Sequence, residues 1–162
     1  MQISDENVYA LLSCLDIYKS HGPDEINSKI LKLLSGNLML IGAVSNLFRS
    51  CVKYEKVPEI WKHAIVIPLS KKGSRLDASN YRPVSLTCVL CKVYEKLSRR
   101  HILQHVQNKV SSLQHGFVTG KSCLSNLLET VEEIANVLDH GHDVDLIYLD
   151  FCKAFDSFSF IA

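Results

Sequence analysis

The sequence has no long hydrophobic run. Its longest uncharged stretch, Leu33 to Phe48, has 16 residues and is interrupted by serine, glycine and asparagine. A membrane-spanning helix needs about 20 consecutive apolar residues, so we expect no membrane partner. The first residues, Met1 to Glu6, are polar and acidic and lack the basic segment of a secretion signal. We therefore expect an intracellular protein, nuclear or cytoplasmic, that is not secreted.

Glycine and proline are scarce as well. Seven glycines and four prolines among 162 residues exclude collagen-like or low-complexity sequence. Apolar residues make up 47% and charged residues 22%, which are ordinary values for a globular protein and exclude wholesale disorder. The length predicts one domain, or one domain and part of another.

The six cysteines are scattered through a chain that is large enough to fold without disulfides. Cys88 and Cys91 form a lone CxxC, with no second pair and no histidine at zinc-finger spacing. We interpret them as ordinary buried thiols rather than as metal or redox ligands.

The net charge of +1 hides a strong asymmetry. Residues 53–121 carry 13 basic and 4 acidic groups, whereas residues 122–162 carry 1 basic and 8 acidic groups. A basic middle followed by an acidic end suggests a polyanion-binding part and a cation-binding part.

Apolar periodicity predicts a helix capped by Ser4, a second helical stretch from about residue 30 to 48, and further helices over 87–108 and 122–138. Residues 64–69 and 81–86 read as two short strands joined by a basic, glycine-containing loop, and residues 144–151 as a third strand. The sequence therefore predicts an α/β (α+β) fold, mostly helical with a small antiparallel sheet.

Three patterns could carry chemistry. Gly116 to Ser122 is similar to a phosphate-binding loop, but it has three residues between its glycines where four are required, so we reject that interpretation. Asp150 ends an apolar strand, where a carboxylate is costly unless it is solvated, paired or bound to a cation such as Mg²⁺. The basic residues of the predicted hairpin could face phosphate or be a solvated surface. From the residues alone both alternatives stay open.

Taken together, several segments resemble the reverse transcriptases of non-long-terminal-repeat (LINE, jockey-like) retrotransposons. In chain order they are His21-Gly22-Pro23-Asp24, Trp61-Lys62-His63-Ala64, Pro68 to Gly73, Asn80 to Thr87, Gln114-His115-Gly116-Phe117 and Tyr148 to Asp156. The match departs from the family at Glu25, where the family often has glycine.

The resemblance implies a right-hand polymerase, with fingers and fingers–palm helices over about 1–142 and the first palm strand over 143–162. It implies that Asp150 binds two catalytic Mg²⁺ ions with help from the Phe151 carbonyl, and that Phe155 excludes a 2′-hydroxyl. The expected nucleotide-binding residues are Lys71, Lys72, Arg82, Phe151 and Phe155. The expected template contacts are Gln114, Gly116 and Phe117.

The partners implied are an RNA template, a DNA primer and deoxynucleoside triphosphates; the oligomeric state is not predicted. The family's second aspartate motif does not occur in the sequence, so we expect a partial domain with an incomplete palm that is inactive alone. The main alternative is a non-catalytic nucleic-acid-binding remnant of a retroelement. An unrelated Mg²⁺-dependent phosphotransferase is disfavoured because no complete phosphate-binding loop is present.

Overall fold

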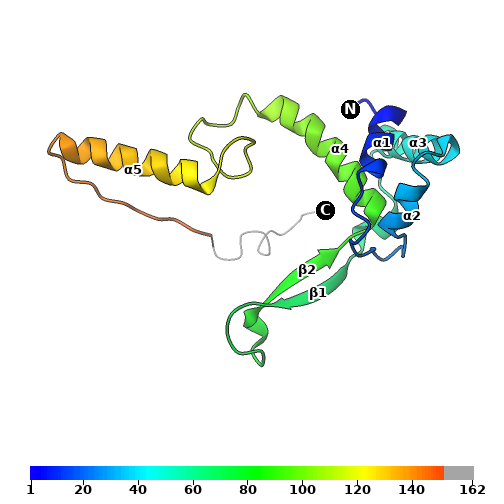
Figure 1. Ribbon diagram of the computed structural model, residues 1–162, viewed down its shortest axis with the longest axis horizontal. Coiled ribbons are helices and arrows are strands. Elements are labelled where there is room, and N and C mark those ends of the chain that lie inside the picture. The colour runs from blue at the N-terminus through cyan, green and yellow to red at the C-terminus, as the bar shows by residue number, and fades with distance from the viewer. Residues whose placement is uncertain (152–162) are drawn as a thin grey trace. The chain divides into compact units, whose positions relative to one another are not determined.

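The computed structural model describes residues 1–151, which fall into two compact units that divide between Lys109 and Val110 (Figure 1). The first unit contains, in order, α1 (Asp5–Ser13), α2 (Ser28–Leu33), α3 (Leu38–Tyr54), the 3-10 turn η1 (Glu59–Lys62), β1 (Ile65–Ser70), the 3-10 turn η2 (Ala78–Asn80), β2 (Tyr81–Leu86) and α4 (Val89–Val106). The second contains α5 (Cys123–Asp139).

The first helix begins where the sequence predicts. Ser4 is its N-cap, and the Ser4 hydroxyl accepts a hydrogen bond from the Asn7 backbone N–H at 3.3 Å. Val8 and Leu12 are fully buried, and α1 packs against α2, α3 and α4. A salt bridge of 2.5 Å between Arg49 and Asp5 adds a link from α3 to the start of α1.

The predicted continuous helix over 30–48 is wrong, because the chain turns between α2 and α3. Asn37 caps α3 by accepting backbone N–H groups from Met39 and Leu40 at 2.9 and 3.3 Å. Asparagine satisfies free N–H groups at a helix start, so it favours a new helix over continuation. Because the chain turns here, part of the predicted apolar stripe is exposed, including Leu34 and Leu38.

An aromatic cluster forms the centre of the core. The ring of Phe48 on α3 lies 6.0 Å from that of Trp61 in η1 and 5.4 Å from that of Tyr94 on α4. The Trp61 and Tyr94 rings are 5.8 Å apart. Edge and tilted contacts of this kind stabilise beyond the area they bury. The cluster therefore joins α3, η1 and α4 at the base of the hairpin.

In the segment His21-Gly22-Pro23-Asp24, the glycine has a structural reason. A Cβ at Gly22 would lie 2.4 Å from the backbone nitrogen of Cys88, so only glycine permits this close approach. Cys88 is fully buried, caps α4 and donates its thiol to the Ile60 carbonyl at 3.6 Å. The loop at Gly22 thus fixes the junction between β2 and α4.

The two predicted strands are confirmed. They form an antiparallel hairpin whose register pairs Ile65 with Leu86 and Ser70 with Tyr81. In Figure 1 this hairpin projects from the helices of its unit. The residues of β1 are exposed along the whole strand.

In the second unit, Ser122 caps α5 in a capping box with Ser125, and Gly141 follows the helix at a φ of 76°. Both signals confirm the helix predicted over 122–138. No residue of α5 is buried. The apolar stripe of this helix therefore does not pack into a core, although its periodicity suggested that it would.

The strand predicted over 144–151 is not formed: these residues have no strand hydrogen bonds. A strand needs a partner strand, and among the described residues β1 and β2 pair with each other and not with 144–151. Among the described residues, no helix is long and apolar enough to cross a membrane.

Candidate nucleotide and nucleic-acid site

The hairpin brings together the three predicted basic nucleotide-binding residues. Arg82 pairs with Leu69, and the Lys71 backbone N–H extends the ladder by donating to the Asn80 carbonyl at 2.6 Å. Lys71 directly follows the last residue of β1, so it lies at the same end of the hairpin as Arg82, the second residue of β2. Lys72 follows at the start of the connecting loop, and all three side chains are exposed.

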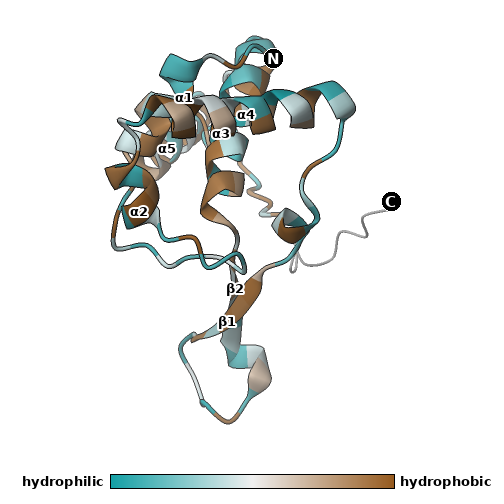
Figure 2. Ribbon diagram, turned by 90° about the vertical axis from the view of Figure 1, so that its right-hand side faces the viewer, coloured by the Kyte–Doolittle hydropathy of each residue, from teal (hydrophilic) through white to brown (hydrophobic). Residues whose placement is uncertain are grey.

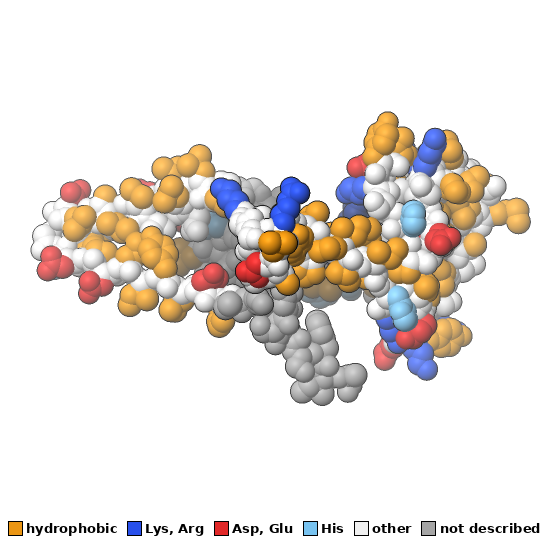
Figure 3. Space-filling view, turned by 90° about the horizontal axis from the view of Figure 1, so that it is seen from below, with side chains coloured by type: hydrophobic (Ala, Val, Ile, Leu, Met, Phe, Trp, Pro, Cys, Tyr) orange, Lys and Arg blue, Asp and Glu red, His pale blue; other side chains and the backbone are white. Residues whose placement is uncertain are grey.

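Figure 3, which views the molecule from the hairpin tip, shows lysine and arginine side chains standing out from it. Figure 2 colours β1 hydrophobic and the connecting loop mostly hydrophilic. Within residues 1–151, no acidic side chain forms a salt bridge with Lys71, Lys72 or Arg82. The tip thus carries exposed cations that no described acidic side chain pairs with.

Three residues, for which the sequence predicted no such role, hold the hairpin loop through hydrogen bonds. The Asn80 side-chain amide donates to the Ser74 carbonyl at 3.0 Å, and the Tyr81 hydroxyl donates to the Arg75 carbonyl at 2.9 Å. Asp77 caps η2 by accepting the Ser79 backbone N–H at 2.9 Å, and this bond lowers the pKa of the Asp77 carboxyl. Asparagine and aspartate at a predicted turn are the signals that sequence reasoning could have used.

The predicted template contacts lie in a loop of the second unit, before α5. The Gln114 side-chain amide donates to the Gly116 carbonyl at 3.1 Å, so these two residues shape the loop. Phe117 has a φ of 62° and a ring that is 91% exposed. A fully exposed aromatic ring is a platform on which a nucleic-acid base can stack.

His115, between these residues, makes contacts that the sequence alone did not reveal. Its side chain is buried, and the ring contacts the Leu113 carbonyl at 3.0 Å and the Glu129 carboxylate at 3.1 Å. Glu129 lies on α5, so this contact anchors the loop to the helix. The Lys121 ammonium also donates to the Ser112 carbonyl and closes the loop.

Asp150 and Phe151 lie in the exposed segment after α5. An Asp150 carboxylate and a Phe151 carbonyl are oxygen donors of the kind that hard divalent cations prefer, so the donor chemistry fits Mg²⁺. Over residues 1–151, no group of three histidine, cysteine or acidic side chains is placed to hold a metal ion. Phe155 lies outside the described residues.

Comparison with known proteins identifies the family of the chain. The family model "Reverse transcriptase (RNA-dependent DNA polymerase)" matches residues 69–160, a range that includes the end of β1, β2, the loop before α5 and Asp150. That match covers more than half of the sequence, and the chain belongs to the reverse transcriptase family.

The related proteins come from transposable elements. A probable RNA-directed DNA polymerase from transposon X-element of Drosophila melanogaster is 29% identical over 85% of this chain. The probable polymerase from transposon BS and the polymerase from mobile element jockey, both from the same organism, are 25% and 27% identical over 93% of this chain. The resemblance to jockey-like retrotransposon enzymes is confirmed. The chain spans only 15–17% of the length of these relatives.

Proposed function

We propose that this chain is the nucleotide-binding and first cation-binding part of an RNA-directed DNA polymerase that uses a right-hand architecture. The observation that supports the proposal is the hairpin, in which Arg82 pairs with Leu69 and Lys71 and Lys72 directly follow the end of β1. Three exposed cations without a salt bridge to any described residue suit the phosphates of a deoxynucleoside triphosphate.

Each basic residue has a distinct task in this proposal. The planar guanidinium of Arg82 binds two phosphate oxygens at once, and the Lys71 and Lys72 ammonium groups supply point charges that neutralise the rest. Asn80 and Tyr81 hold the loop, so the cations need little reordering when the nucleotide arrives.

The acidic segment of the second unit carries a separate proposed role. The Asp150 carboxylate and the Phe151 carbonyl would hold a divalent cation, and the expected role of Phe155, which lies outside the described residues, is to exclude a 2′-hydroxyl. A bound Mg²⁺ would stabilise charge on the reacting phosphate oxygens. Gln114, Gly116 and Phe117 would contact the RNA template, with the Phe117 ring stacking on a base.

Nucleotide binding tests the proposal directly. Binding of a deoxynucleoside triphosphate to the 162-residue chain is measured by calorimetry for the parent and for Lys71→Gln/Lys72→Gln/Arg82→Gln. Because hydrogen bonds to charged groups contribute about 1.5–3 kcal/mol each, and exposure reduces that value, we expect affinity to fall by at least about tenfold.

The matched control is Lys29→Gln/Lys53→Gln/Lys56→Gln, which removes the same charge from exposed positions away from the hairpin. Affinity should be unchanged in the control. Equal losses in both variants would show that only net charge matters. Parent protein that binds RNA but no triphosphate would favour the alternative of a non-catalytic nucleic-acid-binding protein.

A further inference from the structure

A groove runs along α4 in the first unit, apart from the hairpin tip. Its first hollow, about 440 Å³, lies between α4 and the segment after α1, and its second, about 470 Å³, lies farther along α4 near Leu11. Lys96 and Arg99 line both hollows, so the two adjoin along α4. We call the two adjoining hollows the α4 groove. The cations that line it are Lys19, Lys92, Lys96, Arg99 and Arg100.

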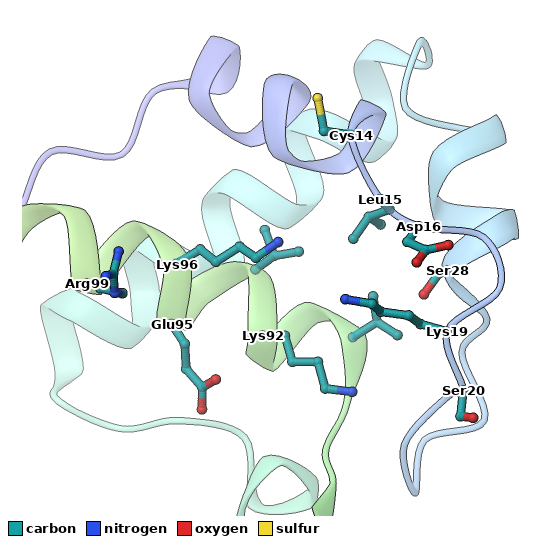
Figure 4. A pocket seen from close by; sticks show the side chains of 12 residues that line it. Cys14, Leu15, Asp16, Lys19, Ser20, Ser28, Lys92, Glu95, Lys96 and Arg99 are labelled. Atoms are coloured by element: carbon teal, nitrogen blue, oxygen red, sulfur yellow. The ribbon is translucent and has the colours of Figure 1, made fainter. Parts of the chain in front are cut away.

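The spacing of the helix cations explains how they meet. Lys92, Lys96 and Arg99 are separated by four and three residues, which places them on one face of α4. Lys19 comes from the opposite wall, and Figure 4 shows it reaching toward α4. Cations from two walls therefore face one channel.

No salt bridge within the described part of the chain neutralises the cations of the groove. The ion pairs formed within residues 1–151 involve none of the five cations. Of the two acids that line the groove, Asp16 accepts the Tyr18 backbone N–H at 3.0 Å. The other, Glu95, accepts the Cys91 thiol at 3.6 Å, and Figure 4 shows it pointing away from Lys96. A groove with this charge attracts a polyanion.

The first hollow is lined by apolar core residues as well as by cations. Leu15, Val89 and Val93 line it and are 8%, 2% and 1% exposed, so they belong to the core. The cations thus stand on packed structure, and the apolar lining offers contact area for sugar or base.

The length of the groove favours a chain of phosphates over a single phosphate group. From Lys92 to Gln104 the helix rises about 18 Å, at about 1.5 Å per residue, which is more than one phosphate group needs. A basic groove that tracks a phosphate backbone is how proteins hold single strands without reading sequence. We propose that the α4 groove binds the backbone phosphates of a single-stranded nucleic acid, as a surface separate from the hairpin tip.

Salt dependence of RNA binding tests this proposal without any nucleotide present. Binding of a short labelled single-stranded RNA is measured by anisotropy over a series of KCl concentrations, for the parent and for Lys92→Gln/Lys96→Gln/Arg99→Gln. With a slope of about −0.7 per phosphate contact, losing three contacts should make the log–log slope shallower by about 2. Lys96→Gln alone should change it by about 0.7.

The control Lys29→Gln/Lys53→Gln/Lys56→Gln should leave the slope unchanged, and Lys92→Arg/Lys96→Arg should retain it because the charge is kept. An unchanged slope in the groove variant, or an equal change in the control, overturns the proposal. Binding to anionic vesicles is measured for the same variants. A groove variant that loses vesicle binding and keeps full RNA binding also overturns the proposal. Triphosphate binding by Lys71→Gln/Lys72→Gln/Arg82→Gln is a separate measurement. The proposal for the hairpin and the proposal for the α4 groove can therefore fail independently.

Cys14 provides a second readout in the parent protein, since this exposed residue lies at the edge of the first hollow. Saturating RNA should slow alkylation of Cys14, and the protection should disappear in the groove variant. An alkylation rate that RNA does not change would contradict binding in the groove.

Discussion

Among the cysteines of residues 1–151, Cys51, Cys88 and Cys91 are buried, whereas Cys14 and Cys123 are exposed. Burial raises the pKa of all three buried thiols, and that of Cys91 reaches about 11 with a contribution from the Glu95 carboxylate. Because the thiolate is the reactive form, the buried cysteines should be inert at neutral pH.

We therefore expect an alkylating reagent to modify Cys14 and Cys123 in the folded protein and to reach the buried three only in denaturant. Peptide mass mapping of samples quenched over time measures this. Alkylation of Cys91 at the rate of Cys14 would contradict the burial of α4 and would reopen a redox or metal role for the CxxC pair.

Glu25 lies in the left-handed region, with a φ of 56°. A residue with a Cβ is strained there by about 1–2 kcal/mol, whereas glycine is not, although glycine costs about 0.5–1 kcal/mol in chain entropy. Glu25→Gly should therefore stabilise the chain by up to about 1 kcal/mol. Urea unfolding measures the change, and Glu25→Ala is the control that should give no gain. A destabilised glycine variant would show that the Glu25 side chain has a role of its own.

At the scale of elements, the hairpin loop depends on one glycine. Gly73 has a φ of 121°, and a Cβ there would lie 2.8 Å from the Asn80 amide nitrogen that donates to Ser74. Gly73→Ala should displace Asn80, loosen the loop over 71–80 and weaken triphosphate binding. The melting temperature should barely change, because the exposed hairpin contributes little to the core.

The control is Gly36→Ala, since a Cβ at Gly36 meets nothing within 4 Å. It should leave triphosphate binding unchanged. Hydrogen exchange of the hairpin amides provides the direct measurement. Unchanged exchange over 71–80 in Gly73→Ala would mean that the loop tolerates the new side chain and that Asn80 does not hold it.

The elements that local chemistry determines could be predicted from the sequence. Ser4 and Ser122 cap helices as expected, and the strand over 81–86 has the predicted bounds. The break at Asn37 also has a local signal, a capping side chain after serine and glycine, but the apolar stripe on both sides of it suggested one helix.

Features that depend on distant partners could not be predicted. The contact of the buried His115 ring with Glu129 joins a loop to a helix, and the approach of Gly22 to Cys88 joins residues far apart in the chain. That Lys71, Lys72 and Arg82 lie on one hairpin could be expected because a single short loop separates them. The α4 groove could not, because Lys19 reaches it through the tertiary fold.

At the scale of the whole molecule, the two units differ in how their helices are stabilised. The core of buried hydrophobic residues extends from Ile3 to Leu97, all within the first unit. By contrast, α5 exposes a stripe of leucines and valines, with Leu124, Leu127 and Leu128 about 60% exposed. Apolar stripes of this size attract other apolar surfaces.

An isolated helix of the length of α5 is marginal in water, since most helix stability comes from packing an apolar face. We therefore expect slow amide exchange in α1, α3 and α4, fast exchange in α5 and in residues 143–151, and self-association that increases with concentration. Hydrogen exchange with mass spectrometry, together with light scattering over a dilution series, measures both. The control is Leu124→Gln/Leu128→Gln, which should suppress self-association without changing exchange in α4. Protection of α5 as strong as that of α4 at the lowest concentration would contradict this prediction, because the stripe would then be covered within a single chain.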